Sequence, residues 1–566
     1  MRYRATAMKR IGALLIALAL VMPLAALPTR AQDAEAKVLR IHQPIYPDDF
    51  DPQKSSFTNE IDILALAYEG LTKLDENQQT VPAAAESWEY NEDATQITFH
   101  LREGLKWSDG SPLTAADFAY AIERTCDPNT AGEYQSLLFE IVGCAEFAAL
   151  AGDDPVNPAE FTQEEWEAAR DALGVTVIDD RTLQLNLTNP APYYHTVAYT
   201  WPFYPVKREI VEQDPDNWWQ TAENHIGNGP FKIVEIIEDQ MIAFEANDNY
   251  WQGRPKIDRI EYIYIADAGV ALEAYRSGEL EIVQIEPPQI PEVEADPELS
   301  DEYLVYPTAS TYSLQFNLTM EPWQDKKVRE AFSYAIDRET LCAEIRSGDC
   351  TPTLSWIPEG VPGFIQTDKY GFDPEAARQA LAESTYGGPE NLPEIKLYYA
   401  SDVSGRQEQA EWLAGQIRDI LGVELTLVPT DGTTLIDLRK NPETFPHLLY
   451  PSGWIQDYPD PQNWLSVYWK CNATFAQRFG YCNPAFDELV SKGDVTVDPE
   501  ERIGYYEQAN QILVDDVPGP FLFNQAAVFV VKPYVVGYTP NASEVEWPGQ
   551  FGSLMTIDID LAQKNA

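Results

Sequence analysis

The chain has 566 residues, of which 39 are Lys or Arg and 91 are Asp or Glu, so its formal net charge is −52. With 44% apolar and 12% aromatic residues it can form large cores, which excludes a chain that is disordered throughout. Because single cores rarely exceed about 250–300 residues, we expect about two to four domains. The negative charge repels phosphate backbones and anionic lipid headgroups, so neither nucleic acid nor a membrane surface is expected as a partner. A cationic or zwitterionic ligand is compatible with this charge, and so is adaptation to a salty or acidic medium.

The first 31 residues have the composition of a secretory signal peptide. Basic side chains up to Arg10 precede an apolar run at 11–27, and the small residues Thr29 and Ala31 follow. A membrane-spanning helix needs about 20 apolar residues, and Pro23 interrupts this run. We therefore predict cleavage after Ala31 and export to the periplasm or the cell exterior. No lipid anchor is expected, because the first cysteine is Cys126.

The cysteines occur in neighbouring pairs. The six positions are Cys126 and Cys144, Cys342 and Cys350, and Cys471 and Cys482. In an exported chain, an even number of closely spaced cysteines indicates disulfides. We predict three local bridges, although the sequence alone allows other connectivities. Metal ligation is the weaker alternative, since there is no C-x-x-C motif and the chain has only five histidines.

Strand and helix patterns alternate through the middle of the chain. Over Gln96–Leu101 the apolar residues Ile97, Phe99 and Leu101 share one face, which predicts a half-buried strand. Similar strand patterns occur at 182–187, 257–265, 395–399 and 423–428.

Helical spacing predicts a helix over Gln407–Leu421. Its apolar face contains Leu413, Ile417, Ile420 and Leu421. The strand at 423–428 follows at once, which is typical of an α/β unit. Further along, Asp498 and Pro499 predict the first turn of another helix, with Glu501 closing a capping box. An α/β protein of several domains follows.

Motifs for catalysis, metals and cofactors are missing from the sequence. We find no H-E-x-x-H, no G-x-S-x-G and no Walker-type glycine loop. The segment Gly227–Pro230 is too short for a dinucleotide fingerprint, and Pro230 lacks the amide that such a loop would use. We expect no metal and no cofactor.

The segment Gly453–Pro461 is the most informative local motif. It combines two aromatic rings, two carboxylates and turn-forming residues. Such a loop suits a concave site, where rings form the walls and a carboxylate shielded from water binds an ammonium group. The alternative is that Asp457 and Asp460 only cap turns, as aspartates before proline often do.

Several segments, in order and spacing, resemble the bacterial solute-binding family that includes the oligopeptide- and dipeptide-binding proteins of ABC importers. They are Phe50–Lys54, Tyr68–Leu71, Phe99–Arg102, Lys106–Gly110, Gly227–Phe231, Asn249–Trp251, Tyr275–Leu280, Val328–Phe332, Ala335–Arg338, Gly453–Asp457 and Asn483–Leu489. The resemblance covers essentially the whole chain after the predicted signal peptide.

The resemblance implies a two-lobed α/β clamp, the type II (cluster C) periplasmic-binding-protein fold, with an extra domain on one lobe. The expected divisions are 32–69, 203–309 and 525–566 for lobe I, 70–202 for its extra domain, and 310–524 for lobe II. Segments near 309 and 525 would form the hinge. Such a protein is a monomer that performs no chemistry: ligand selects the closed form, and a membrane permease recognises that form.

The resemblance also implies ligand-binding residues. Asp457 falls where peptide-binding relatives pair an aspartate with the ligand's α-ammonium, and Gly453, Trp454 and Tyr458 belong to the same loop. Tyr134 matches another position that faces the ligand. The rest of an extended peptide would be held by backbone hydrogen bonds, as an added strand is.

The chain departs from its relatives at several of these positions. Ser56 stands where the oligopeptide binder has a carboxylate, and Pro451 stands where a relative has an arginine for the ligand carboxylate. Arg439 aligns loosely with a second such arginine. The relative's interlobe cysteine pair is replaced by Ser310 and Ile455. The ammonium contact is therefore better supported than the carboxylate contact or a preference for ligand length.

Two classes of function follow. The first is an importer receptor for oligopeptides or dipeptides, with an oligosaccharide or another small solute as the alternative; nickel chelates are disfavoured by the few histidines. The second is a secreted glycoside hydrolase that uses Asp457 and Asp460 as its carboxylate pair. Such enzymes need carboxyl groups about 5–5.5 Å apart, or about 6.5–9.5 Å apart in inverting enzymes.

Overall fold

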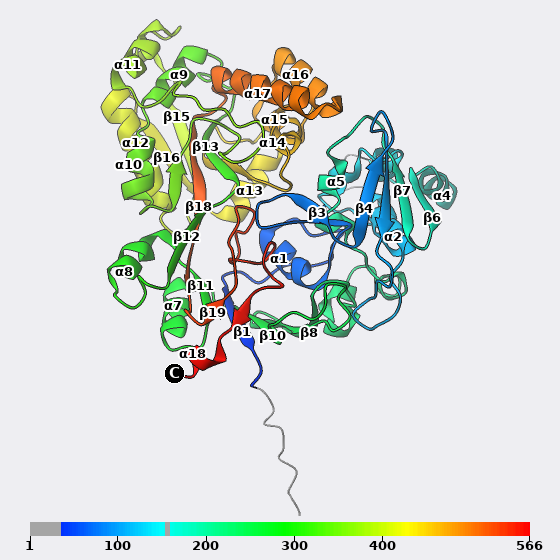
Figure 1. Ribbon diagram of the computed structural model, residues 1–566. Helices are drawn as coiled ribbons and strands as arrows, with labels where there is room; N and C mark the ends of the chain where they lie inside the picture. The colour runs from blue at the N-terminus through cyan, green and yellow to red at the C-terminus, as the bar shows by residue number, and fades with distance from the viewer. Residues whose placement is uncertain (1–34, 153–158) are drawn as a thin grey trace, which may run out of the picture. The chain divides into compact units, whose positions relative to one another are not determined.

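The computed structural model describes residues 35–152 and 159–566, and the predicted signal peptide at 1–31 lies outside them. The largest sheet of the described chain has twelve strands, in the order β16-β15-β17-β13-β18-β11-β1-β10-β9-β8, with β12 and β14 also paired to β18 (Figure 1). Its strands are β1 (Val38–Gln43), β8 (Phe231–Ile237), β9 (Met241–Ala246), β10 (Arg259–Tyr264), β11 (Ile282–Gln284), β12 (Tyr303–Pro307), β13 (Ser310–Phe316), β14 (Cys350–Pro352), β15 (Ile395–Ala400), β16 (Leu425–Thr430), β17 (Leu448–Ile455) and β18 (Phe521–Val531).

Strand β18 connects the two halves of this sheet. Its first residues pair with β13, where Tyr312 lies opposite Phe523, and its last residues pair with β11, where Val283 lies opposite Val530. Nine of its eleven residues are buried, as its almost continuous apolar sequence requires. Beside it, the Thr308 N–H donates to the Gln525 carbonyl at 2.9 Å. The chain segments near 309 and 525 therefore lie next to each other.

The predicted α/β unit is confirmed. β15 and β16 are parallel, with Ile395 opposite Leu425, and α12 (Arg406–Leu421) connects them. Leu413, Ile417 and Leu421 are buried on its inner face, while Ile420 is only half-buried at the edge of the same core. The second strand begins two residues later than predicted, because Gly422 ends the helix at a φ of +71° and the chain must then turn toward the sheet.

A second core forms around a four-stranded antiparallel sheet. Its strands are β4 (Ala85–Tyr90), β5 (Gln96–Leu101), β7 (Thr182–Asn186) and β6 (Val175–Asp179), in that spatial order. The predicted alternation holds in β5, where Ile97, Phe99 and Leu101 are buried under α2 (Ala115–Cys126). A short two-stranded hairpin, β2 (Thr72–Leu74) and β3 (Thr80–Pro82), precedes this sheet in the chain.

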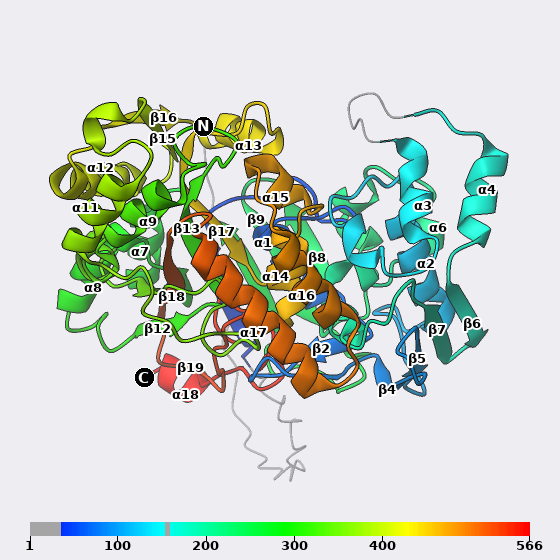
Figure 2. The same cartoon turned by 90° about the horizontal axis from the view of Figure 1, so that it is seen from above.

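Helices α14 (Pro461–Trp469), α16 (Pro484–Val495) and α17 (Pro499–Asp516) pack against one another (Figure 2). Asp498 accepts a hydrogen bond from the Glu501 N–H at 2.9 Å, which confirms the predicted start of α17. The Glu501 side chain does not complete a capping box. It accepts a hydrogen bond from the Tyr505 hydroxyl at 2.8 Å, one turn along the helix.

The predicted cysteine pairing is confirmed. Bridges join Cys126 to Cys144, Cys342 to Cys350 and Cys471 to Cys482. In residues 35–152 and 159–566, no helix has both the length and the apolar character needed to span a bilayer.

Candidate functional site

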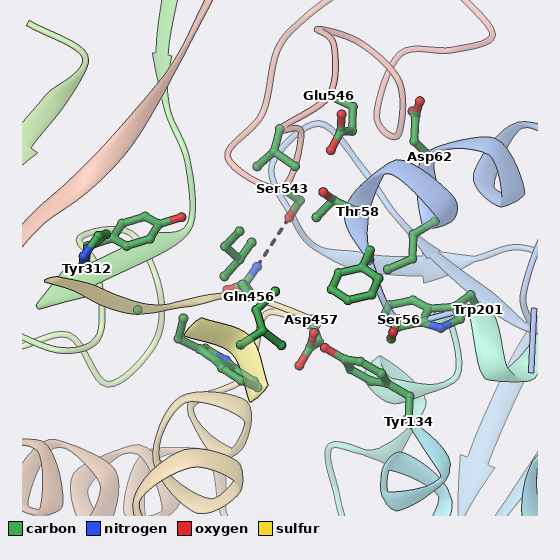
Figure 3. A pocket seen from close by; sticks show the side chains of 18 of the residues that line it. Ser56, Thr58, Asp62, Tyr134, Trp201, Tyr312, Gln456, Asp457, Ser543 and Glu546 are labelled. Carbon is green, nitrogen blue, oxygen red and sulfur yellow. Dashed lines mark hydrogen bonds between the residues drawn. The ribbon is translucent and has the colours of Figure 1, made fainter. Parts of the chain in front are cut away.

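A cavity of about 630 Å³ lies where segments far apart in the sequence meet (Figure 3). Its volume falls within the range of about 300–1,000 Å³ that is typical of small-molecule sites. The lining comes from the start of α1 (Thr58–Ala67), from the segments around Tyr134 and 199–204, from α12, α13 (Gly432–Lys440), the end of β17 and the C-terminal segment 543–551.

Asp457 faces this cavity two residues beyond the end of β17. Buried Asn463, in the first turns of α14, holds it from both sides: Asn463 Nδ2 donates to Asp457 Oδ2 at 2.8 Å, and Asn463 Oδ1 accepts from the Asp457 N–H at 3.1 Å. The Tyr199 hydroxyl donates to the Asp457 carbonyl. The carboxylate is therefore oriented before any ligand arrives.

The environment of Asp457 favours a neutral carboxyl when the cavity is empty. Burial raises its pKa to about 7, while hydrogen bonds from Asn463 and Tyr134 oppose part of that rise. Within the described residues Asp457 has no ion-pair partner. A cation entering the cavity would therefore bind here, because the charged form of the carboxyl lacks a counter-ion.

Asp460 has a different role from Asp457. It caps α14 by accepting from the Gln462 N–H at 2.9 Å, and it pairs with both terminal nitrogens of buried Arg502 at 2.7 and 2.8 Å. Asp460 is not among the residues that line the cavity. The structure thus does not present Asp457 and Asp460 to one site as a glycosidase pair, and the turn-capping alternative is correct for Asp460.

The aromatic residues of the predicted loop divide between cavity and core. Trp454 lines the cavity, and its Nε1 donates to Asn463 Oδ1 at 3.0 Å. Tyr134 lies beside Asp457, as Figure 3 shows, and its ring is 4.8 Å from that of Trp201. Tyr458 is buried instead in the core of the four-stranded sheet, and its hydroxyl donates to Gln462. The structure therefore brings Trp454 and Tyr134 together with Asp457, but not Tyr458.

The other predicted positions also line the cavity. Gly453 allows β13 and β17 to approach closely, since a Cβ there would lie 2.6 Å from the Thr311 carbonyl oxygen. Ser56 lies just before α1, and its N–H donates to Glu60 Oε2 at 2.7 Å. Arg439 lies in the last turn of α13, and Pro451 lies on β17.

Three charged cavity residues escaped the sequence analysis. Arg406, at the start of α12, donates to Gln409 Oε1 at 3.3 Å, and its Nε has no partner in the described part of the chain. Asp62 comes from α1 and Glu546 from the C-terminal segment. Local signals were present for two of the three. Arg406 is a cation at a helix N-terminus, where it opposes the helix dipole, and Asp62 interrupts an apolar helix sequence. Glu546 has no such signal.

Polar contacts join three segments beside Asp457. Gln456 Nε2 donates to Gln78 Oε1 at 2.8 Å, and the Ser543 hydroxyl donates to the same oxygen at 3.1 Å. Gln456 Nε2 also donates to the Ser543 hydroxyl at 3.4 Å. Figure 3 draws this hydrogen bond as a dashed line. The end of β17, the β2–β3 turn and the C-terminal segment are thus tied together at the edge of the cavity.

Comparison with known proteins identifies the fold and the class of function. The family described as "Bacterial extracellular solute-binding proteins, family 5 Middle" matches residues 79–476. The chain is 29% identical over 496 residues to the periplasmic oligopeptide-binding protein OppA of Escherichia coli, covering 86% of this chain and 87% of OppA. It is 28% identical over 538 residues to the probable deoxycholate-binding periplasmic protein YgiS of Escherichia coli, and the match covers 93% of this chain and 95% of YgiS.

The fold matches solved structures of such proteins. The Haemophilus influenzae OppA complex with RPPGFSPFR superimposes with a TM-score of 0.73 at 26% identity, over 93% of this chain and 99% of that one. The expected two-lobed type II binding-protein fold is thereby confirmed. The family consists of solute-binding receptors rather than enzymes, which removes the glycosidase alternative. This chain belongs to the bacterial extracellular solute-binding proteins of family 5.

Proposed function

We propose that this protein is the extracytoplasmic receptor of an ABC importer and that it captures short peptides for a membrane permease. The observation that carries the proposal is Asp457, a carboxylate fixed by Asn463 inside the cavity and left without a cationic partner in the described chain. A peptide's α-ammonium supplies that partner. An ion pair shielded from water is much stronger than one at the surface.

The opposite charge on the ligand also has a place. Arg406 and Arg439 line the cavity from α12 and α13, and burial lowers the pKa of Arg406, as does its neighbour Arg346. Both effects disfavour the charged form of Arg406, and a ligand carboxylate bound between Arg406 and Arg439 would offset them. Relatives named for oligopeptides and dipeptides support a peptide ligand.

The remaining parts of the proposal follow from the resemblance. Residues 1–31 act as a signal peptide cleaved after Ala31, and the mature monomer works in the periplasm or outside the cell. Lobe I comprises 32–69, 203–309 and 525–566, with 70–202 as its extra domain, and lobe II comprises 310–524. In this division the hinge falls at the segments near 309 and 525; the hydrogen bond between Thr308 and Gln525, which joins them, supports it.

Calorimetry with tri-alanine and its N-acetylated form tests the ammonium contact. We expect tri-alanine to bind and the acetylated peptide to lose nearly all affinity. Asp457→Asn should weaken tri-alanine binding by about 3–5 kcal/mol, since a buried ammonium would lose its counter-charge. The control is Asp239→Asn, in an exposed turn with a φ of +57° that asparagine also adopts. Equal binding of both peptides would refute the proposal.

A second candidate is an amphipathic organic anion, which the same receptor would carry. Apolar side chains contribute much of the cavity lining, including Trp454, Leu435 and Phe475, and the relative YgiS is named for deoxycholate. Such a ligand would use Arg406 and Arg439 without Asp457. Native mass spectrometry of the purified protein distinguishes the two, because retained peptide and retained steroid acid differ in mass and Asp457→Asn would release only the peptide.

A further inference from the structure

We propose that the cavity contains a subsite for a carboxylate that carries a bulky apolar group, formed by one face of α13 together with the residues at the start of α12. In a peptide, such a group is a C-terminal leucine, isoleucine or phenylalanine. That reading rests on the proposed function, whereas the subsite itself does not, since an amphipathic organic anion has the same chemistry.

Helix α13 turns one face toward the cavity. Gly432, Leu435, Ile436 and Arg439 line it, at the spacing of a single helix face, and the other residues of the helix do not. Side chains three or four positions apart on a helix have Cβ atoms about 5–6 Å from each other. Arg439 therefore presents a guanidinium beside the apolar side chains of Leu435 and Ile436. In a C-terminal amino acid the carboxylate and the side chain leave the same carbon, so both groups fit one such face.

The start of α12 extends this face. The Gly432 N–H donates to both carboxylate oxygens of Asp402 at 3.0 Å, which holds the segment before α12 against the start of α13. Val403 in this segment and Arg406 in the first turn of α12 also line the cavity. A second apolar side chain and a second guanidinium thus join those of α13.

The two arginines share one side of the cavity. Burial raises the pKa of Tyr312, and the charges of Arg406 and Arg439 are among those that oppose the rise, so both guanidiniums lie near this ring. Tyr312 also lines the cavity, and Figure 3 shows it apart from Asp457. A carboxylate at the arginines and an ammonium at Asp457 therefore belong to different ends of one ligand.

Large apolar side chains on this face are exposed. Ile436 is 43% exposed and Val403 is 45% exposed, and both lie within the cavity lining. The lining continues through buried Leu435 to Phe475 and Trp454, whose rings pack edge to face at 5.0 Å. Exposed apolar surface gathered in a cavity marks a binding site for an apolar group. A ligand side chain that covers it removes apolar area from water on both partners, which favours binding.

The protein does not neutralise the arginines of this face. Although the chain has 91 acidic residues, neither Arg406 nor Arg439 forms an ion pair in its described part. Asp349 and Glu286 act on Arg406 from beyond ion-pair distance, and Asp349 already pairs with Arg346 at 2.7 Å. Both cavity arginines are only half-buried, so a ligand can reach them. A carboxylate supplies the partner that they lack.

Calorimetry with matched peptides tests the subsite. Ala-Ala-Leu is compared with Ala-Ala-Ala, which lacks the apolar group, with Leu-Ala-Ala, which carries it at the other end, and with the C-terminal amide of Ala-Ala-Leu, which lacks the carboxylate. We expect Ala-Ala-Leu to bind about tenfold or more tightly than each of the other three. Equal binding of Ala-Ala-Leu and Ala-Ala-Ala, or of Ala-Ala-Leu and Leu-Ala-Ala, overturns the proposal.

Variants assign this preference to the proposed face. Ile436→Thr combined with Val403→Thr should reduce the preference for Ala-Ala-Leu over Ala-Ala-Ala by about threefold or more and leave Ala-Ala-Ala binding in place. Arg439→Gln should weaken binding of Ala-Ala-Leu and not of its amide. The matched control is Ile178→Thr, at an exposed position of β6 outside the cavity lining, which should change neither. A preference that survives the double variant unchanged places the apolar group elsewhere and overturns the proposal.

A second measurement does not depend on peptide binding. N-acetyl-leucine has the carboxylate and the apolar group but no ammonium, so we expect it to raise the melting temperature of the Asp457→Asn protein. N-acetylglycine and N-acetyl-leucine amide at the same concentration should leave it nearly unchanged, and adding Ile436→Thr and Val403→Thr should reduce the shift. Circular dichroism of each variant confirms that it is folded.

The two measurements separate the subsite from the peptide function. If no peptide binds but N-acetyl-leucine gives its shift, only the peptide function is rejected, and the ligand is an organic anion. If N-acetyl-leucine gives no shift and the peptides show no preference, including the case in which none of them binds, the subsite is rejected.

Discussion

The carboxyl of Asp457 should make ligand binding depend on pH. Its pKa is raised to about 7 by burial in the empty cavity, and pairing with an ammonium stabilises the charged form. Binding must therefore release a proton at acidic pH. We expect affinity for a peptide to fall about tenfold for each pH unit below 7 and to level off above 7, up to the ammonium pKa of about 8.

The same shift has the opposite sign for stability. A carboxyl whose pKa is raised on folding favours the folded state at low pH, and this contribution is lost as pH rises from its usual pKa, about 4, to about 7. Glu60 and Glu544 have pKa values raised to about 7 as well, so total stability does not isolate Asp457. The contribution of Asp457 is isolated by measuring peptide affinity by calorimetry across pH 5–8, for the wild type and for Asp457→Asn. A pH slope that persists unchanged in the variant would assign the titration to another group.

Sequence reasoning found the residues of one local motif and missed those that only folding brings together. Trp454 and Asp457 stand three positions apart, so composition and family resemblance both marked them. Tyr458 belongs to the same motif, but the chain turns after Asp457 and directs that ring into another core. Asp62 and Glu546 are 484 positions apart, and no local pattern relates them. The sequence alone therefore could not predict that Asp62 and Glu546 line the same cavity.

The turn between β17 and α14 depends on Asp460. This residue both caps α14 and pairs with buried Arg502. Asp460→Ala should lower the free energy of unfolding by about 3–5 kcal/mol, because the guanidinium would stay buried without its partner. Asp431 is the matched control, since it caps α13 at an exposed position by accepting from the Thr434 N–H at 2.9 Å. Asp431→Ala should cost only about 0.5–2 kcal/mol.

Chemical denaturation of both variants measures this difference. Equal losses of stability for Asp460→Ala and Asp431→Ala would show that the ion pair with Arg502 adds nothing to the cap. Asp460→Ala should also weaken peptide binding, since the α14 turn carries Asn463, which holds Asp457. Asp431→Ala is a control for stability only, because α13 carries Arg439, which lines the cavity.

The close approach of β13 and β17 requires glycine at position 453. A Cβ there would lie 2.6 Å from the Thr311 carbonyl oxygen and 2.5 Å from the Tyr312 ring, so Gly453→Ala must push the strands apart. We expect a loss of about 1–3 kcal/mol in unfolding free energy and weaker peptide binding. Gly415→Ala in α12, whose Cβ meets nothing nearer than 3.8 Å, should instead stabilise the protein by about 0.5–1 kcal/mol. Thermal denaturation measures the stability of both variants, and calorimetry measures peptide binding by Gly453→Ala. If Gly453→Ala left stability and binding unchanged, the packing argument would be wrong.

At the level of elements, the apolar patterns identified strand and helix types well and their ends less well. β5 and α12 fall where predicted, because one face of each is buried and the pattern reports burial directly. Ends depend on capping geometry instead. Glu501 has the right spacing for a capping box, but its carboxylate accepts a hydrogen bond from the Tyr505 hydroxyl one turn along the helix instead. Such competition among side chains is not encoded in a local motif.

The arrangement of the whole sheet could not be derived from local patterns. β1 pairs in parallel with β10, with Val38 opposite Arg259, and also with β11. Strand β18 pairs with residues more than 200 positions earlier in the sequence; Val530 of β18, for example, lies opposite Val283 of β11. Local periodicity contains no information about such partners. Local patterns predicted an α/β protein of several domains. Only the family resemblance, which covers essentially the whole chain after the predicted signal peptide, predicted the two-lobed fold.

Contacts at the edge of the cavity should stabilise the ligand-bound form more than the fold itself. Gln456, Gln78 and Ser543 come from three segments and form one hydrogen-bonded group beside Asp457. In the proposed mechanism these segments separate when the lobes open, so the contacts exist only in the closed form. A neutral hydrogen bond contributes about 0.5–1.5 kcal/mol. Gln456→Ala should therefore accelerate peptide dissociation by about 3- to 30-fold. It also removes the acceptor of buried Trp464 Nε1, which donates to Gln456 Oε1 at 3.4 Å, so the free energy of unfolding of the empty protein should fall by about 0.5–1.5 kcal/mol.

Stopped-flow displacement of a labelled peptide and denaturant unfolding give the two quantities. Gln78→Ala removes the hydrogen bond to Gln456 from the other side, at a half-buried turn position that does not line the main cavity, and it leaves the Gln456–Ser543 contact in place. It should therefore reproduce part of the faster dissociation without touching the ligand. The double variant should be no faster than Gln456→Ala alone, since Gln456→Ala already removes the interaction with Gln78. If Gln456→Ala slows association and leaves dissociation unchanged, or if Gln78→Ala has no effect, then this group does not hold the closed form, and closure must depend on the ligand's own contacts with Asp457 and the arginines.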